Sequence, residues 1–101
     1  MKMPEPASLQ PIALTELRRG ETGLVDGLNT AALGATAEER DSMLSRLRDL
    51  GFFPGARCEV IARMWFGGDP VAVRVGGSTF ALRRVEAAAV RIRRITAPVA
   101  A

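Results

Sequence analysis

Few side chains in this sequence have the type and spacing that covalent chemistry needs. The chain contains no histidine and no tyrosine, so the commonest general base and a phenolic acid are both missing. Ser42, Ser45 and Ser78 therefore have no histidine to activate their hydroxyl groups. The single cysteine, Cys58, falls on the predicted inward face of a strand, which suits a small buried side chain better than a nucleophile. The sequence therefore predicts a protein that is not an enzyme and has no cofactor.

The ligands of a tight metal site are also missing. Zinc and similar metals are held by clusters of cysteine and histidine, which this chain lacks. Glu38, Glu39 and Asp41 lie close together, but they fall at the start of a predicted helix, where carboxylates stabilise the N-terminus. We therefore predict no metal ligands, and binding of Fe²⁺ or Zn²⁺ no tighter than micromolar.

The best candidate for a contact with another protein is the cluster Met64-Trp65-Phe66. It follows a predicted strand and precedes Gly67-Gly68, which places it in a connection between strands. Tryptophan is enriched among the residues that dominate protein interfaces. The alternative is that Met64 and Phe66 close the end of the core while Trp65 covers them. The two interpretations are balanced for Trp65, and we predict Met64 and Trp65 as partner-binding residues.

Basic side chains are concentrated in the second half of the chain. Six basic and eight acidic residues precede Arg57, whereas eight basic and three acidic residues lie from Arg57 onward. Such a half could meet phosphates, acidic protein or anionic lipid, although a solvated strand surface is the favoured interpretation. Five arginines cluster in sequence: Arg83, Arg84, Arg91, Arg93 and Arg94. No exposed aromatic residues are interleaved with them to stack on bases, which disfavours nucleic-acid binding.

One helix, predicted over residues 37–50, is the most strongly indicated element. Thr36 and Glu39 have the spacing of a capping box, in which the hydroxyl accepts from the Glu39 amide and the carboxylate reaches back. Apolar residues recur at the spacing of a buried helical stripe: Met43, Leu47 and Leu50.

The helix is predicted to stop at Gly51, which can adopt a left-handed conformation without strain. A stop of the Schellman type brings Leu47 into contact with Phe52. Pro54-Gly55 then predicts a type II turn, because proline presets φ and glycine supplies a positive φ.

The remaining elements are predicted to be short strands. Residues 14–17 can form one helical turn, and residues 22–28 a strand in which Gly23 and Gly27 indicate a bulge or a close backbone crossing. After Gly55 the hydrophobic period changes to two, in the runs 57–63, 71–75, 79–82 and 90–93. Gly76-Gly77 predicts a two-residue hairpin, and residues 84–88 a short helical turn before the last strand. The predicted fold is mainly β: a small, strongly bent barrel of about five antiparallel strands with one inserted helix.

Composition suggests one domain with short flanking segments. Residues 1–12 carry three prolines and are predicted to form a disordered lead-in, residues 13–95 the domain, and residues 96–101 a tail. No signal peptide and no stretch of the ~20 apolar residues needed to cross a bilayer is evident. The lone cysteine favours an intracellular compartment. We therefore expect a cytoplasmic protein without direct membrane insertion.

Three motifs occur in a fixed order along this chain. They are Arg46-Leu47-x-x-Leu50-Gly51-Phe52-x-Pro54-Gly55, Gly67-x-Asp69-Pro70 and Phe80-Ala81-Leu82-Arg83-x-x-Glu86-Ala87. Because these three motifs occur together, the sequence resembles the ferrous iron transport protein A (FeoA) family over residues 14–95. The family's structural positions are filled by Leu47, Leu50, Gly51, Pro54, Gly55, Gly67, Pro70, Leu82 and Arg83. Trp65 departs from the family pattern, in which a smaller residue or proline is expected.

The resemblance implies an SH3-like barrel and a non-catalytic, cytoplasmic regulatory role in ferrous iron uptake. It also implies a partner, the cytoplasmic part of the membrane transporter FeoB, which imports Fe²⁺ and carries a GTP-binding domain. Two alternatives remain open, a nucleic-acid-binding small barrel and a weak transition-metal carrier. Any oligonucleotide binding is expected to be weak, independent of sequence and strongly dependent on salt.

Overall fold

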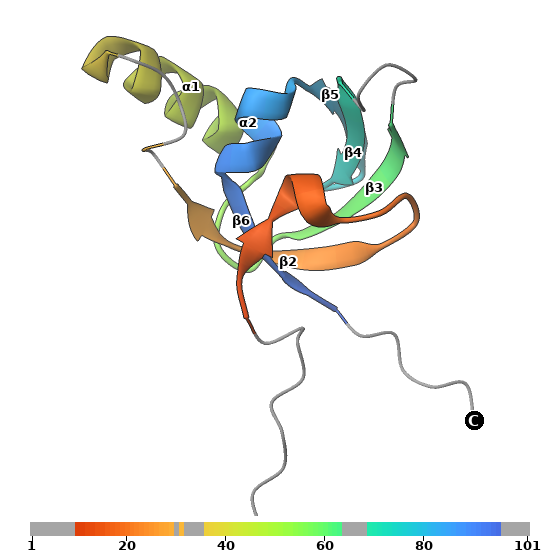
Figure 1. The fold of residues 1–101 in the computed structure, drawn as a ribbon. Helices are drawn as coiled ribbons and strands as arrows, with labels where there is room; N and C mark the ends of the chain where they lie inside the picture. The colour runs from red at the N-terminus through yellow and green to blue at the C-terminus, as the bar shows by residue number, and fades with distance from the viewer. Residues whose placement is uncertain (1–9, 30, 32–35, 64–68, 96–101) are drawn as a thin grey trace, which may run out of the picture.

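The structure is a computed structural model that describes residues 10–29, 31, 36–63 and 69–95 (Figure 1). Its elements in chain order are β1 (Ile12–Ala13), the 3-10 helix η2 (Leu14–Glu16), β2 (Thr22–Leu28), α1 (Ala37–Leu50), β3 (Arg57–Arg63), β4 (Val71–Val75), β5 (Ser78–Leu82), α2 (Arg84–Ala89) and β6 (Val90–Arg94). The predicted helix and the two helical turns are confirmed by α1, η2 and α2. The predicted hairpin is confirmed as well, because Gly76 and Gly77 join β4 to β5 with positive φ of 58° and 82°.

The described strands form one antiparallel sheet with the order β1-β6-β2-β3-β4-β5. The mainly-β prediction is therefore confirmed. The sheet has a sixth strand that the sequence pattern does not reveal, because Ile12 pairs with Ile92 and Ala13 with Arg91. Ile12 belongs to the sheet rather than to the predicted lead-in. A strand of two residues is too short to show any hydrophobic period.

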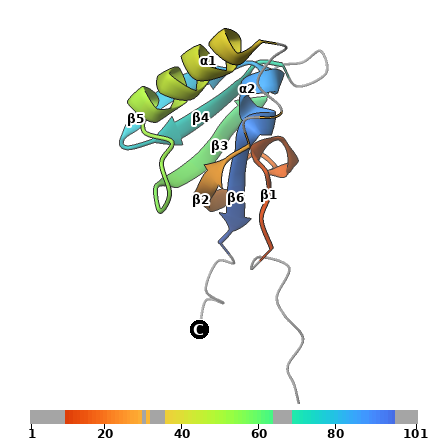
Figure 2. The same cartoon turned by 90° about the vertical axis from the view of Figure 1, so that its left-hand side faces the viewer.

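The sheet curls around a single core, with α1 at the outside of the molecule in both views (Figures 1 and 2). The core consists of buried apolar side chains from every strand but the two-residue β1, from η2, α1 and α2, and from the residues that follow η2 and α1: Leu14, Leu17, Val25, Leu47, Phe52, Cys58, Val60, Val71, Val73, Val75, Leu82, Ala87, Ala89, Val90 and Ile92. Ile12, Leu28 and Phe80 pack against it while partly exposed. The predicted alternation of apolar and polar residues thus produces one dry face and one wet face.

One glycine of β2 lets this strand fit its neighbour, and the other borders a bulge. A Cβ atom on Gly23 would lie 2.8 Å from Ile92 Cδ1 and 3.1 Å from the Arg93 carbonyl oxygen, so β6 crosses too closely for a side chain. The register of β2 with β6 shifts between Val25 and Gly27, which marks a bulge. Both predictions for these glycines, a close crossing and a bulge, are confirmed.

A second bulge, in β3, corrects the prediction for Arg63. The register with β4 shifts between Val60 and Ala62, so Arg63 pairs with the buried Val71. Arg63 therefore lies on the inward face, not on the polar face that strict alternation predicts. Its guanidinium donates hydrogen bonds to the carbonyl oxygens of Thr15, at 2.7 Å, and of Leu17.

The N-terminus of α1 is capped as the sequence predicts, with one difference. The Thr36 hydroxyl oxygen accepts a hydrogen bond from the Glu39 amide at 3.0 Å. The Glu39 carboxylate reaches back to the Thr36 hydroxyl, at 3.1 Å. The capping box expects this carboxylate to accept from the Thr36 backbone amide.

The C-terminus of α1 is a Schellman stop at Gly51, which has φ of 112°. The Gly51 amide donates to the Arg48 carbonyl at 3.0 Å, and the Phe52 amide donates to the Leu47 carbonyl at 3.0 Å. Leu47 and Phe52 are both fully buried. This prediction is confirmed.

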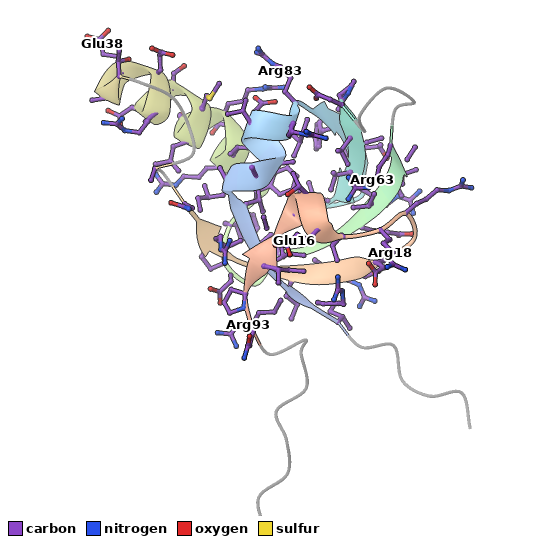
Figure 3. All side chains as sticks on the ribbon, viewed as in Figure 1. Glu16, Arg18, Glu38, Arg63, Arg83 and Arg93 are labelled. Carbon is purple, nitrogen blue, oxygen red and sulfur yellow. The ribbon has the colours of Figure 1, made fainter. Side chains whose placement is uncertain are left out.

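The other end of α1 extends away from the barrel, and Glu38 lies near its tip (Figure 3). Leu47 is the buried residue of this helix, whereas Met43, Leu44 and Leu50 are partly buried. Among the described residues, neither helix is long and apolar enough to cross a membrane.

Candidate partner-binding surface

Phe53 is the most open of the large apolar side chains that the described residues expose. It is 55% exposed, compared with 40% for Leu24 and 38% for Val85. Phe53 follows the Schellman stop, where Phe52 is fully buried in the core while the next side chain, Phe53, is exposed to solvent. The sequence pattern does not single out Phe53. The available signal was the pair of phenylalanines between two turn motifs, of which only Phe52 is needed for the core.

Two hollows in the surface meet at Phe53. The first, of about 280 Å³, lies between α1 and the end of β2 and is lined by Leu28, Leu44, Arg48, Phe52 and Pro54, among others. The second, of about 450 Å³, lies beside the start of β3 and the hairpin between β4 and β5. Its charged lining residues are Arg57, Glu59 and Arg74. An exposed aromatic ring between two hollows is the arrangement expected of a protein-contact site.

A third hollow, of about 410 Å³, lies between α1 and α2 and contains a buried carboxylate. Glu86 is 1% exposed, forms an ion pair with Arg46, and accepts a hydrogen bond from the Arg83 amide at 2.9 Å. The pair joins α1 to α2 and thus connects the first and third sequence motifs. Nothing in the sequence pattern alone pairs these two residues, because they are far apart along the chain.

The five arginines that cluster in sequence do not form one patch. Figure 3 shows Arg83 and Arg93 at opposite ends of the molecule. The β6 arginines are engaged within the chain: Arg91 donates to the Pro11 carbonyl at 3.0 Å, and Arg93 pairs with Asp26 at 2.8 Å. Arg94 lies 3.3 Å from Glu21. This arrangement does not favour a continuous phosphate-binding surface.

Cys58 is buried at 1% exposure, as the strand pattern predicts. Burial raises the pKa of the Cys58 thiol to about 11, against the smaller, opposite effect of a hydrogen bond with the backbone of Gly23. The thiol therefore remains protonated at neutral pH and is not a reactive thiolate. Within the described ranges, no group of three or more histidine, cysteine or carboxylate residues is placed to hold a metal ion.

The predicted partner-binding residues Met64 and Trp65 lie outside the described residues, as does Gly67. The other family positions take several environments. Leu47 and Leu82 are buried, Leu50, Gly51 and Pro70 are partly buried, and Pro54, Gly55 and Arg83 are exposed. The carboxylates Glu38, Glu39 and Asp41 are all exposed on the first turns of α1.

The curled antiparallel sheet, with a helix inserted between its second and third strands, defines a small barrel of the SH3-like class. A family model described as the FeoA domain matches residues 12–94. The chain therefore belongs to the FeoA domain family. A comparison with curated protein sequences found no significant match.

Solved structures agree with this assignment. The Stenotrophomonas maltophilia FeoA, complexed with zinc, is 33% identical with a TM-score of 0.66, covering 80% of this chain and 88% of its own. It is described as a prokaryotic SH3 domain protein with a suggested role as a ferrous iron transport activating factor. The Chlorobium tepidum FeoA is 28% identical with a TM-score of 0.65, covering 86% of this chain and 73% of its own.

A manganese-dependent transcriptional repressor shares the fold. It is 23% identical with a TM-score of 0.69, and the match covers 93% of this chain but 40% of the repressor. The SH3-like barrel predicted from the resemblance is confirmed by these comparisons.

Proposed function

We propose that this protein is a cytoplasmic, non-catalytic accessory factor of ferrous iron transport that binds the cytoplasmic part of the FeoB transporter. The observation that carries the proposal is the FeoA family match over residues 12–94. The suggested activating role of the Stenotrophomonas relative supports it.

The described side chains also favour binding over catalysis. The chain has no histidine, and its one thiol is buried and protonated. The same barrel exposes an aromatic ring between two hollows, which is the feature expected of a contact surface.

Calorimetry with the purified cytoplasmic part of FeoB from the same organism tests this proposal. We expect saturable, one-to-one binding that a small barrel of unrelated family and similar charge does not reproduce. The titration should be made with FeoB free of nucleotide and loaded with a GTP analogue. An absence of binding in both states would contradict the proposed function.

A further inference from the structure

We propose that Phe53, with the hollow on each side of it, binds an acidic protein segment that carries an apolar side chain. This surface is called the Phe53 surface below. The inference rests on the proposed function in one respect, because it takes FeoB as the protein that supplies this acidic segment. The preference for an acidic, apolar segment depends only on the exposure, hollows and charges of residues in this chain.

Phe53 is held in place by its backbone. Its amide donates to the Gly51 carbonyl, and its carbonyl accepts from the Ala56 amide, both at 3.0 Å. The turn is tied in addition to β2, because Gly55 donates to the Val25 carbonyl at 2.8 Å and Val25 donates to the Ala56 carbonyl at 2.7 Å. A fixed backbone lowers the entropy that a contact residue loses on binding.

The Phe53 surface has room for an apolar side chain. The hollow beside α1 is lined by Leu28, Leu44 and Phe52, and the hollow on the other side by Ala56 and Val75. Over half of Phe53 is exposed, so a partner side chain placed against it would remove apolar area from water.

The lining of the two hollows carries open positive charge. Arg48 lies in the first hollow and Arg57 in the second, and both are exposed. In the described part of the chain, no carboxylate lies within ion-pair distance of either guanidinium. The single carboxylate of the lining, Glu59, faces Arg74 at 3.8 Å. The two open arginines therefore favour an acidic occupant.

A protein segment fits this surface better than a nucleic acid does. Oligonucleotide sites combine a basic groove with several exposed stacking rings, whereas here Phe53 is the one exposed ring among the described residues that line the two hollows. An apolar side chain of a peptide can pack against the apolar lining, whereas a phosphate can only pair with the arginines at its edge.

The test uses two synthetic hexapeptides and the full chain labelled with ¹⁵N. The acidic probe is acetyl-Glu-Asp-Leu-Phe-Asp-Glu-amide, and the matched control has lysine at the four acidic positions. We expect the acidic probe to shift backbone amides at residues 51–57 and 25–28 in a saturable manner, and the lysine peptide to leave them unchanged. Unchanged amides with the acidic probe, or shifts centred elsewhere, would overturn the proposal. A single-stranded oligothymidylate that shifts the same amides at lower concentration would also overturn it.

Matched variants separate binding from folding. Phe53→Ser and Arg57→Glu should each weaken the acidic probe about tenfold, as expected for a central contact residue and for charge reversal. Val85→Ser and Arg19→Glu change an exposed large apolar residue and an exposed arginine elsewhere on the chain, and should leave its affinity unchanged. Thermal unfolding of each variant shows that the comparison is made between folded proteins.

FeoB as ligand distinguishes this inference from the proposed function. If FeoB binds but Phe53→Ser and Arg57→Glu do not weaken it, the proposed function stands and the Phe53 surface is rejected as its site. If FeoB does not bind while the acidic probe still does so through Phe53, the surface stands and its assignment to iron transport is rejected.

Discussion

The two glycines of β2 differ in what surrounds them, although both lie in the same strand. Gly23 has Ile92 Cδ1 within 2.8 Å of where a Cβ atom would stand, whereas Gly27 has no atom within 4 Å. Gly23→Ala should therefore lower the free energy of unfolding by about 1–3 kcal/mol, because β6 must move. Gly27→Ala is the matched control and should change it by less than about 0.5 kcal/mol. Urea denaturation measures both, and equal effects would contradict the close crossing.

Cys58 makes stability depend on pH in the alkaline range. The pKa of its thiol is about 11 in the folded chain, compared with 9.0 as the ordinary value. The folded state thus keeps its proton where the unfolded state loses it. The stabilisation is complete below pH 9 and is lost as pH rises towards 11.

Between these two pKa values, the free energy of unfolding is expected to fall by about 1.4 kcal/mol per pH unit. Urea denaturation at several pH values between 8 and 11 measures it, in about half-unit steps. The variant Cys58→Ala should lose this part of the pH dependence. A slope that is the same in the variant would show that another group is responsible.

At the scale of elements, the Arg46–Glu86 pair connects the inserted helix to α2. Glu86 is buried while the side chain of Arg46 is 46% exposed, so removing the arginine takes the ion-pair partner from a buried carboxylate that still accepts from the Arg83 amide. Arg46→Met should lower the free energy of unfolding by about 1–3 kcal/mol. The double variant Arg46→Met, Glu86→Leu should recover most of this loss, since no buried charge then remains.

Urea denaturation of the unchanged protein, of Arg46→Met, of Glu86→Leu and of the double variant completes a double-mutant cycle. A double variant that is no more stable than Arg46→Met alone would mean that the carboxylate is not the source of the loss.

The elements show which features a sequence can predict. The Schellman stop at Gly51 is local, since its hydrogen bonds join residues at most five apart, and it was predicted correctly. The inward position of Arg63 depends on a bulge opposite β4, and bulges require knowledge of the partner strand. The burial of Glu86 depends in the same way on a helix that is distant in the sequence.

At the scale of the whole molecule, fold and family follow from the ordered motifs, but the contact surface does not. The exposure of Phe53 arises only when Phe52 enters the core and both hollows form around its neighbour. The sequence can rank aromatic residues as contact candidates, yet it cannot tell which one the finished barrel leaves outside.

The antiparallel pairing of β1 with β6 has a consequence for the evolution of this domain. Ile12 lies beside Ile92, so the points where the chain enters and leaves the barrel are close together. A domain with adjacent ends can be joined to, or inserted into, another protein without stretching either one. In the manganese-dependent repressor, the region that shares this fold covers 40% of the chain. Gene fusion can thus join the barrel to other proteins as an intact folded domain.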